Sequence, residues 1–473
     1  MIKKKSSIVP IPKNGKKSLN KSDNYRSIAI GSIFSKVLDN IIIEKHSSVL
    51  HSSSLQFGFK AKHSTTQCCF VVQEVVDYFV RHDSICHVLL LDATKAFDRV
   101  NYVKLFQLLS KRCMCPLTTY LLLQMYTNQS LQVTWSTSCS ESFQCSNGVK
   151  QGGVLSPILF CVYIDELLCQ LKNAGYGCHI GDVYLGCFGY ADDLTLLAPS
   201  ISSAKFMLSI CERFALEYDV CFNPSKSAHL LLYKPSTQHV NHNCPLYLNN
   251  VAIEKVENAS LLGSCIGTNQ NTINITKAIS DLVYRTNILM SRFRSCNSSV
   301  LSKLFRSYCT AFYGSSLWGL SDAALQRVTV AWRKCLRRVW RISPRTHSAL
   351  VSLIDGSPPL HHLLCSRFAS FMANCQKSQN HVVKFIYRVC FHSDSVVASN
   401  IRHLCATLSL NNVDELVTCD YNKFFQTHAN NDDDICTAMA VRDLISVRDG
   451  ESQIFADHND FYVNDFIFLL CVI

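Results

Sequence analysis

The chain has 473 residues, of which 48% are hydrophobic and 17% are charged. With 11 prolines and 17 glycines, it is not a disordered, collagen-like or low-complexity chain, and its length allows roughly two to four packed domains. Lysine and arginine outnumber aspartate and glutamate by 46 to 35, and the resulting net charge of +11 favours an anionic partner.

The positive charge is concentrated in two stretches. Residues 1–26 contain eight basic residues and one acidic residue, and residues 271–350 contain 13 basic and two acidic residues. Residues 411–473 show the opposite balance, with three basic and twelve acidic residues. This distribution is expected if only part of the surface contacts a polyanion.

The 25 cysteines are scattered without a repeating framework, so we expect reduced thiols in an intracellular protein. The sequence has no CxxC pair. The closest approach to zinc-ligand spacing, His361 and His362 with Cys365, is more simply interpreted as ordinary core and surface residues. No apolar run of about 18 residues and no signal-peptide pattern occurs, so we expect no membrane association.

The first predicted elements are an extended apolar stretch at residues 6–12 and a helix over residues 32–47. Further along, CHVLLL at residues 86–91 has the length and composition of a buried strand, and it ends directly before Asp92. A helical pattern of apolar residues then runs from Phe97 to Leu109. Asp92 is therefore expected at the mouth of a strand.

The sequence VKQGGVLSPILF predicts a loop followed by a helix, with Ser156 at the N-cap and Pro157 at the first helical position. The next segment, VYLGCFGYADDLTLLA, contains two apolar runs that meet at Asp192 and Asp193. This pattern predicts a hairpin with both acids at its tip. A helix is expected over residues 204–218, and residues 271–346 read as mostly helical and basic.

The adjacent acids of the hairpin need a chemical explanation, because burying carboxylates without partners is costly. If Asp92 lies beside them, carboxylates about 4 Å apart repel by ~4 kcal/mol per pair at an effective dielectric constant near 20. A divalent cation would neutralise them, and oxygen-only ligands favour Mg²⁺ or Mn²⁺. Taken alone, the paired acids fit a metal site and a coincidence equally well.

The order of these segments closely resembles the polymerase core of reverse transcriptases from non-LTR (LINE-type) retrotransposons. The resemblance extends from about residue 9 to residue 340. It rests on seven blocks in the family's order: PIPKNGKK with NYRSIAI, QFGFKAKHST, LDATKAFDRV, VKQGGVLSPILF, GYADDLTLLA, FNPSKS and LLGSCIG. The resemblance implies an RNA-directed DNA polymerase of α+β fold class, with a right-hand arrangement of fingers, palm and thumb followed by a mostly helical C-terminal region.

The resemblance also implies roles for individual residues. In the family, the acids that correspond to Asp92, Asp192 and Asp193 hold two Mg²⁺ ions, for which Mn²⁺ can substitute, and Lys226 resembles a lysine that protonates the leaving pyrophosphate. The residues expected to bind the incoming nucleotide are Lys13, Arg26, Phe97, Gln151, Gly152 and Tyr190. Asp98 is expected to have a structural role.

Several of these roles have simpler alternatives. Phe97 would exclude a ribose 2′-hydroxyl, but it also fits an ordinary core position on a helix. The Gln151-Gly152 loop could be a plain turn, and Lys226 could be a surface lysine after a proline turn. Lys16 and Lys17 are neighbouring alternatives to Lys13, and Ser27 replaces the proline that the family has after the arginine at position 26.

The segment AWRKCLRRVWRI resembles the thumb region of the family, with a basic face over an apolar stripe. The residues expected to bind template and primer phosphates are Arg333, Lys334, Arg337, Arg338 and Arg341. A solvated helix surface is the alternative.

We therefore expect four parts: fingers at 1–85, palm at 86–270, a basic thumb or extension at 271–346, and a C-terminal region of unknown role at 347–473. The expected partners are an RNA template, a DNA primer and dNTPs, and the expected location is nuclear. We expect a polymerase portion that lacks the family's endonuclease domain. The alternatives are a catalytically inactive nucleic-acid-binding fragment and an RNA-templated RNA polymerase.

Overall fold

The computed structural model describes residues 5–13, 18–127, 129–237, 245–320 and 323–408. The chain divides into two compact units. The first comprises residues 1–262 with 380–382, and the second comprises residues 263–379 with 383–473. Our predicted boundaries of fingers, palm and thumb remain a prediction.

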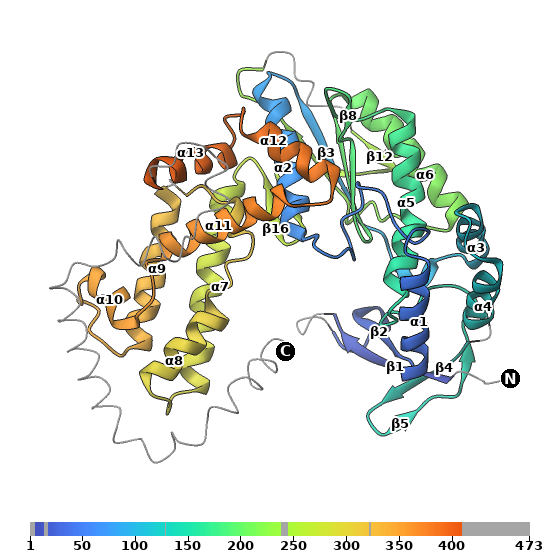
Figure 1. Ribbon diagram of the computed structural model, residues 1–473, viewed down its shortest axis with the longest axis horizontal. Helices are drawn as coiled ribbons and strands as arrows, with labels where there is room; N and C mark the ends of the chain where they lie inside the picture. Colours follow the sequence, from blue (N-terminus) through green and yellow to red (C-terminus); the bar gives the residue numbers. More distant parts are fainter. Residues whose placement is uncertain (1–4, 14–17, 128, 238–244, 321–322, 409–473) are drawn as a thin grey trace. The chain divides into compact units, whose positions relative to one another are not determined.

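The N-terminal part of the first unit forms a small mixed sheet (Figure 1). Strand β1 (Lys5–Pro12), the predicted extended stretch, pairs antiparallel with β2 (Tyr25–Ile30) and parallel with β4 (Ser130–Trp135). The short strands β5 (Ser138–Cys139) and β6 (Phe143–Gln144) both pair with β4. Arg26 lies on β2 of this sheet.

A second five-stranded sheet forms the centre of the first unit, in the order β14-β11-β3-β10-β9. The predicted strand at residues 86–91 is its middle strand β3 (Cys86–Leu91), and the predicted hairpin is formed by β9 (Cys187–Tyr190) and β10 (Asp193–Ala198). On the other side of β3 lie β11 (Ala228–Leu232) and β14 (Glu254–Lys255). All residues of β3 are buried or nearly so, which explains its continuous apolar run.

Helices pack against this sheet. Helix α2 (Thr65–Arg81) contacts β3 and β9, α5 (Ser156–Ala174) contacts β9, and α6 (Ile201–Tyr218) contacts β10 (Figure 1). The remaining helices and short strands of the first unit are α1 (Ile33–Lys45), α3 (Tyr102–Lys111), α4 (Pro116–Thr127), β7 (His179–Ile180), β8 (Val183–Tyr184), β12 (Tyr247–Leu248), β13 (Val251–Ala252) and β15 (Asn258–Leu261).

Two predicted helix starts differ from the structure. Leu155, not Ser156, is the N-cap of α5, so Ser156 and Pro157 lie one position further into the helix than predicted. The helical pattern after Asp92 is interrupted: a 3₁₀ turn at Ala96–Arg99 comes first, and α3 begins separately. The break arises because the side chain of Asn101 accepts a hydrogen bond from the Lys104 N–H and so caps a new helix.

The described part of the second unit is mostly helical, and α7 packs against α9 (Figure 1). Its elements are β16 (Ser264–Gly267), α7 (Gln270–Arg292), α8 (Ser298–Leu304) with a π turn (Phe305–Cys309), a 3₁₀ turn (Ser315–Leu317), α9 (Ala323–Val339), α10 (Ser348–Asp355), α11 (Leu360–Gln376), α12 (His381–Cys390) and α13 (Val396–Leu408). The structure thus has the predicted α+β class followed by a mostly helical region.

A small polar network holds this helical unit together. The buried carboxylate of Asp355 accepts hydrogen bonds through Oδ1 from the indole Nε1 of Trp340, at 2.8 Å, and from the hydroxyl of Ser302. Because the three residues belong to α10, to the end of α9 and to α8, the carboxylate links three helices at one point.

Two predictions from the sequence concern the thiols and the membrane. The cysteines among the described residues are free thiols, and most of them are buried or half-buried. No helix in the described ranges has the length and apolar character needed to span a bilayer.

Candidate active site

The three predicted acids lie at one edge of the central sheet. Asp92 directly follows β3, Asp192 lies in the turn of the hairpin, and Asp193 is the first residue of β10. In the antiparallel pairing of β3 with β10, Leu91 lies opposite Leu194. Continuing this register by one residue places Asp92 opposite Asp193. The structure therefore brings together carboxylates that are about 100 residues apart in the sequence.

The electrostatics of the hairpin acids reflect this crowding. Burial, followed by repulsion from Asp192 and Asp92, raises the pKa of Asp193 to about 6. The pKa of Asp192 is also raised, mainly by burial and further by the charge of Asp92, whereas the charge of Arg26 lowers it. Like charges that raise one another's pKa create a demand for a positive counter-charge.

The loop FNPSKS is built around Asp92. The backbone N–H of Asn223 donates to the carbonyl of Asp92 at 2.8 Å, and the N–H of Asp92 donates to the hydroxyl of buried Ser227 at 3.3 Å. The ammonium of Lys226 lies 3.2 Å from Oδ2 of Asp92. This part of the site therefore has one positive contact from the protein itself.

The donor set suits a hard cation, although its side chains do not form a closed coordination site. In the described residues, no three His, Cys, Asp or Glu side chains are arranged so that they could hold a metal ion together. The candidate ligands offer only oxygen atoms, and the raised pKa values of Asp192 and Asp193 indicate that negative charge at the hairpin is poorly compensated. An ion bound at Asp92 would compete with Lys226 for the carboxylate.

Phe97 and Gln151 are half-buried, and Gly152 is exposed. The half-buried ring of Phe97 stacks on Phe160 of α5, with ring centroids 4.6 Å apart. The carbonyl of Gln151 accepts from the N–H of Ala29 at 2.7 Å, which ties the loop to β2. Gly152 has a φ of +102°, and a Cβ there would lie 3.0 Å from the Ala29 oxygen. The glycine thus permits a close approach of loop and strand.

Asp98 and Tyr190 complete the predicted set on this side. The Asp98 carboxylate accepts a hydrogen bond from Nε2 of Gln151 at 3.3 Å, which agrees with the structural role expected for it. Tyr190 is half-buried at the end of β9 and lies opposite Asp193 in the hairpin.

The two basic residues assigned to the nucleotide are not equivalent. Arg26 is exposed on β2, and its charge acts on Asp192. Lys13 follows β1 and lines a cavity of about 660 Å³ together with Gln151 and Asp98. None of the three acids lines that cavity, and the residues of β2 that do line it, Tyr25, Ser27 and Ala29, alternate with Arg26 along the strand. The structure therefore associates Arg26, and not Lys13, with the acids.

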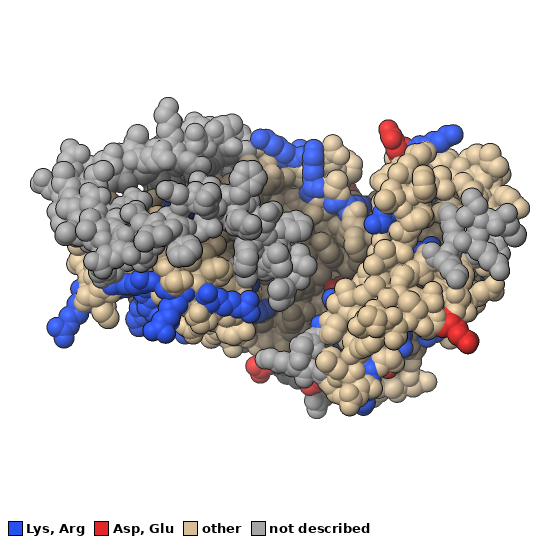
Figure 2. Space-filling model, turned by 90° about the horizontal axis from the view of Figure 1, so that it is seen from below, with Lys and Arg blue, Asp and Glu red and all other residues tan. Residues whose placement is uncertain are grey.

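Helix α9 has the predicted basic face over an apolar stripe. Its buried side chains include Trp332, Leu336 and Val339. Figure 2 shows Lys and Arg side chains gathered on the face of the second unit that is visible there.

The basic residues of this face differ in their contacts. Arg337 donates to the carbonyl of Thr346, Arg341 donates to the carbonyls of Arg294 and Cys296, and Arg338 donates to Asn287. Lys334 is exposed, and Arg333 is half-buried. Arg337 and Arg341 thus stabilise loops of the second unit, which is a role the sequence pattern does not reveal.

Comparison with known proteins identifies the family of this fold and site. The family model for reverse transcriptase (RNA-dependent DNA polymerase) matches residues 11–266, more than half of the chain. The chain belongs to this family. The predicted resemblance to non-LTR retrotransposon reverse transcriptases is confirmed by the relatives that follow.

The chain is similar to several transposon proteins. A probable RNA-directed DNA polymerase from transposon X-element of Drosophila melanogaster is 26% identical over 337 residues, covering 67% of this chain and 35% of the relative. The RNA-directed DNA polymerase from mobile element jockey of Drosophila funebris is 23% identical, covering 71% and 37%. A Pol polyprotein from the retrotransposable element R2 of Popillia japonica is 28% identical, covering 46% and 31%. The chain spans about a third of the length of these relatives.

Among solved structures, telomerase from Candida tropicalis in complex with a fragment of telomeric RNA aligns with 94% of this chain and 64% of its own. The sequence identity is 12% and the TM-score is 0.41, a likeness too distant to bear on function.

Two residues that contact Asp92 are absent from the predicted site. Asn223 and Ser227 contact the backbone of Asp92 from the FNPSKS loop. The FNPSKS block points to this loop, because Lys226 of the same block is a predicted site residue. A lysine is a more obvious candidate for chemistry than the asparagine and serine that shape the loop around it.

Proposed function

We propose that this chain is an RNA-directed DNA polymerase that extends a DNA primer on an RNA template. The observation that carries the proposal is the placement of Asp92 and Asp193 opposite one another, with Asp192 beside them, in a chain of the reverse transcriptase family. In the proposed reaction, the 3′-hydroxyl of the primer attacks the α-phosphate of a dNTP and pyrophosphate leaves.

Asp92, Asp192 and Asp193 are the residues that would hold Mg²⁺ or Mn²⁺. The bound ions would supply charge neutralisation for the attacking and leaving oxygens. Arg26 is placed to compensate negative charge beside Asp192, which suits a contact with the triphosphate. Lys226 already contacts Asp92 and could move to the departing pyrophosphate as the proton donor.

The choice of sugar is assigned to Phe97. Its ring is fixed by stacking on Phe160, so it cannot turn away easily to admit an extra hydroxyl at the sugar. We therefore propose that dNTPs are preferred over rNTPs. Incorporation of both nucleotide types by the purified chain would test this point, and equal rates would favour the RNA-templated RNA polymerase alternative.

The decisive experiment is primer extension by the wild-type chain and by Asp192→Ala. We expect the variant to lose at least about 10³-fold in extension rate, because a ligand of the reacting ions is removed. Template–primer affinity, measured by filter binding, should change by less than about threefold. A variant that extends the primer at a near wild-type rate would refute the metal assignment.

The alternative, an inactive nucleic-acid-binding fragment, gives a different result in the same assay. The wild-type chain would then bind the template–primer but fail to extend it with either Mg²⁺ or Mn²⁺. The presence of all three acids at one sheet edge favours the active polymerase over this alternative.

A further inference from the structure

The block QFGFKAKHST has no role in the function proposed so far, yet its first residues lie against the strand that leads to the acids. Phe57 donates its N–H to the carbonyl of Gly189 at 2.7 Å, and Gly189 donates to the carbonyl of Leu55 at 2.9 Å. Gln56 thus forms a parallel bridge with Gly189 of β9. The segment is a short addition to the edge of the central sheet.

The side chain of Gln56 reaches past this bridge to the turn of the hairpin. Gln56 is fully buried, and its Oε1 accepts from the N–H of Ala191 at 3.0 Å and from the N–H of Gly58 at 2.8 Å. Its Nε2 lies 3.4 Å from the carbonyl oxygen of Ala191 and donates to it. One amide therefore binds both backbone polar groups of the residue directly before Asp192.

Ala191 needs such a partner because its backbone is unfavourable. Its φ is +56°, in the left-handed region, where a residue with a Cβ costs about 1–2 kcal/mol. Ala191 is also buried, so water cannot satisfy its N–H and carbonyl. Without Gln56, the turn would lose the hydrogen bonds that oppose its relaxation to a more favourable conformation.

Two glycines make this contact possible. A Cβ on Gly58 would lie 2.3 Å from the nitrogen of Ala191, and a Cβ on Gly189 would lie 2.9 Å from Nε2 of Gln56. A Cβ on Gly58 would therefore collide with the hairpin backbone, and a Cβ on Gly189 would displace the Gln56 side chain. This close packing indicates that the hairpin turn and the QFG segment have complementary shapes.

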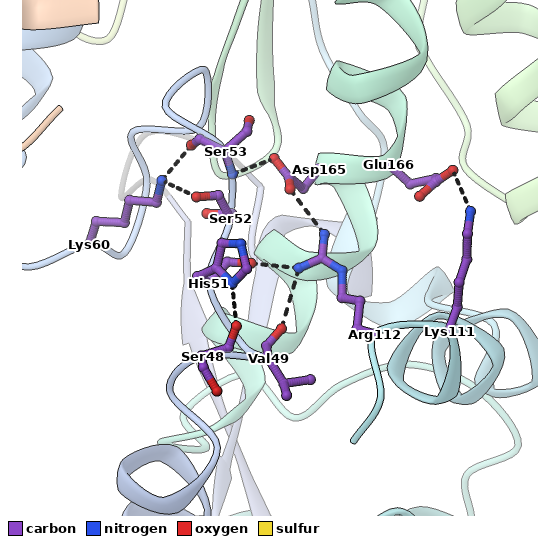
Figure 3. A network of polar contacts seen from close by, with 10 residues as sticks. All are labelled: Ser48, Val49, His51, Ser52, Ser53, Lys60, Lys111, Arg112, Asp165 and Glu166. Carbon is purple, nitrogen blue, oxygen red and sulfur yellow. Dashed lines mark hydrogen bonds and ion pairs between the residues drawn. The ribbon is translucent and has the colours of Figure 1, made fainter. Parts of the chain in front are cut away.

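The segment that carries Gln56 is itself fastened on both sides (Figure 3). On the N-terminal side, the buried carboxylate of Asp165 accepts from the N–H of Ser53 at 2.9 Å and from the Arg112 guanidinium at 3.0 Å. Arg112 also donates to the carbonyl of His51. On the C-terminal side, the ammonium of Lys60 returns to the carbonyl of Ser52 at 2.8 Å. Gln56 thus projects from a closed loop that is anchored to α3 and α5.

We propose that Gln56 is a positioning residue that holds the Ala191-Asp192 turn and thereby fixes the Asp192 carboxylate for metal binding. This inference rests on the proposed polymerase function. Gln56 acts through the backbone of Ala191, so it supports metal binding without itself contacting the reacting groups.

The test replaces Gln56 by methionine, which keeps the size of the side chain and removes its hydrogen-bonding groups. Gln67→Met is the matched control, because Gln67 is also buried and also bonds a backbone N–H, that of Ser64, but caps α2 instead of contacting the hairpin. Hydrogen exchange of residues 187–193 reports the turn, and Mn²⁺ affinity measured by electron paramagnetic resonance reports the acids. Asp192→Asn identifies the Mn²⁺ signal that belongs to this site.

We expect Gln56→Met to weaken Mn²⁺ binding about tenfold or more, as removal of outer-sphere support commonly does, and to accelerate exchange at the turn. Gln67→Met should leave both unchanged. If the two variants behave alike in both measurements, the proposal is wrong.

If Gln56→Met does not fold, Gln56→Glu decides the matter, because a neutral carboxyl offers an acceptor and one donor at the same place. A folded Glu variant should keep exchange at the turn and Mn²⁺ affinity within about threefold of wild type, and loss of both would overturn the proposal. Neither readout requires turnover. A wild-type chain that fails to extend a primer would refute the proposed function. If hydrogen exchange at the turn still depends on Gln56 in that case, the positioning role of Gln56 would stand.

Discussion

At the level of single residues, the strongest functional signal is the unrelieved negative charge at the hairpin. The raised pKa values of Asp192 and Asp193 have the same leading cause, burial, and the same additional cause, neighbouring carboxylates. This arrangement makes the folded protein less stable whenever these groups are ionised without a counter-ion. The acids therefore lower the stability of the metal-free chain for the sake of the site.

Replacement of Asp193 by asparagine should therefore stabilise the metal-free chain. Its pKa in the fold, about 6, lies above the usual value of 3.8. Proton binding thus favours the folded state, and stability is lost as the pH rises between these values. Asp193 is crowded by the protein but keeps contact with solvent, so screening reduces the effect, and we expect a gain of about 1 kcal/mol at pH 7.5 in the presence of EDTA.

Urea unfolding of the wild type and of Asp193→Asn between pH 5 and pH 8 measures this difference. The gap between the two free energies of unfolding should widen as the pH rises and should shrink when Mg²⁺ is added, since only the wild type keeps all its ligands. A gap that is constant over this range would show that the Asp193 carboxylate is not perturbed by its neighbours.

At the level of elements, we expect the loss of the Asp355 carboxylate to destabilise the second unit strongly. Asp355→Ala leaves the indole N–H of Trp340 and the hydroxyl of Ser302 without their acceptor in a buried place. We expect the free energy of unfolding of the chain to fall by about 2–3 kcal/mol.

The control for this prediction is Asp394→Ala. Asp394 pairs with Arg402 at the surface, and its side chain is 89% exposed, so its loss should cost less than about 0.5 kcal/mol. Denaturant unfolding monitored by tryptophan fluorescence follows both variants. Equal effects of the two substitutions would show that the buried network contributes nothing special.

The sequence predicted elements well where one short pattern determines them. The apolar run before Asp92 has the length of a buried strand, and two such runs that meet at a turn are typical of a hairpin. The predicted N-cap of α5 differs from the observed one by one residue, because the choice between Leu155 and Ser156 depends on backbone angles that the sequence does not specify.

The sequence could not reveal contacts that depend on the path of the chain. Lys13 and Arg26 belong to one sequence block, but Lys13 follows β1 and lines a cavity that none of the three acids lines, whereas Arg26 lies on β2. The nucleotide contact of Lys13 stays a prediction. The hydrogen bonds between Gln56 and Ala191 join residues 135 positions apart, so no local sequence pattern predicts them. Such contacts become visible only once the strands are paired.

At the level of the whole molecule, the uneven charge predicts how nucleic acid should bind. The described part of the second unit carries the basic face of α9, and Lys334 is an exposed member of that face. Each lysine that neutralises a phosphate contributes about 0.7–0.9 to the slope of log affinity against log salt concentration. Lys334→Ser should therefore weaken template–primer binding and reduce this slope by a little less than one.

Lys377→Ser is the matched control, because Lys377 is equally exposed but follows α11 instead of lying on α9. Filter binding at several KCl concentrations gives both slopes. If both variants retain the wild-type slope, the basic face of α9 does not contact phosphates.

The contact of Gln56 with the hairpin also has a consequence for how the chain folds. Gln56 leaves the ribosome 135 residues before its partner Ala191, and the strands β3 and β10 are separated by about 100 residues. Closing such long loops is slow, because their entropy must be lost before the contacts compensate for it. The turn at Ala191 should therefore be among the last parts of the first unit to form, and a nascent chain that ends before residue 191 would lack the contact with Gln56 and two of the three acids.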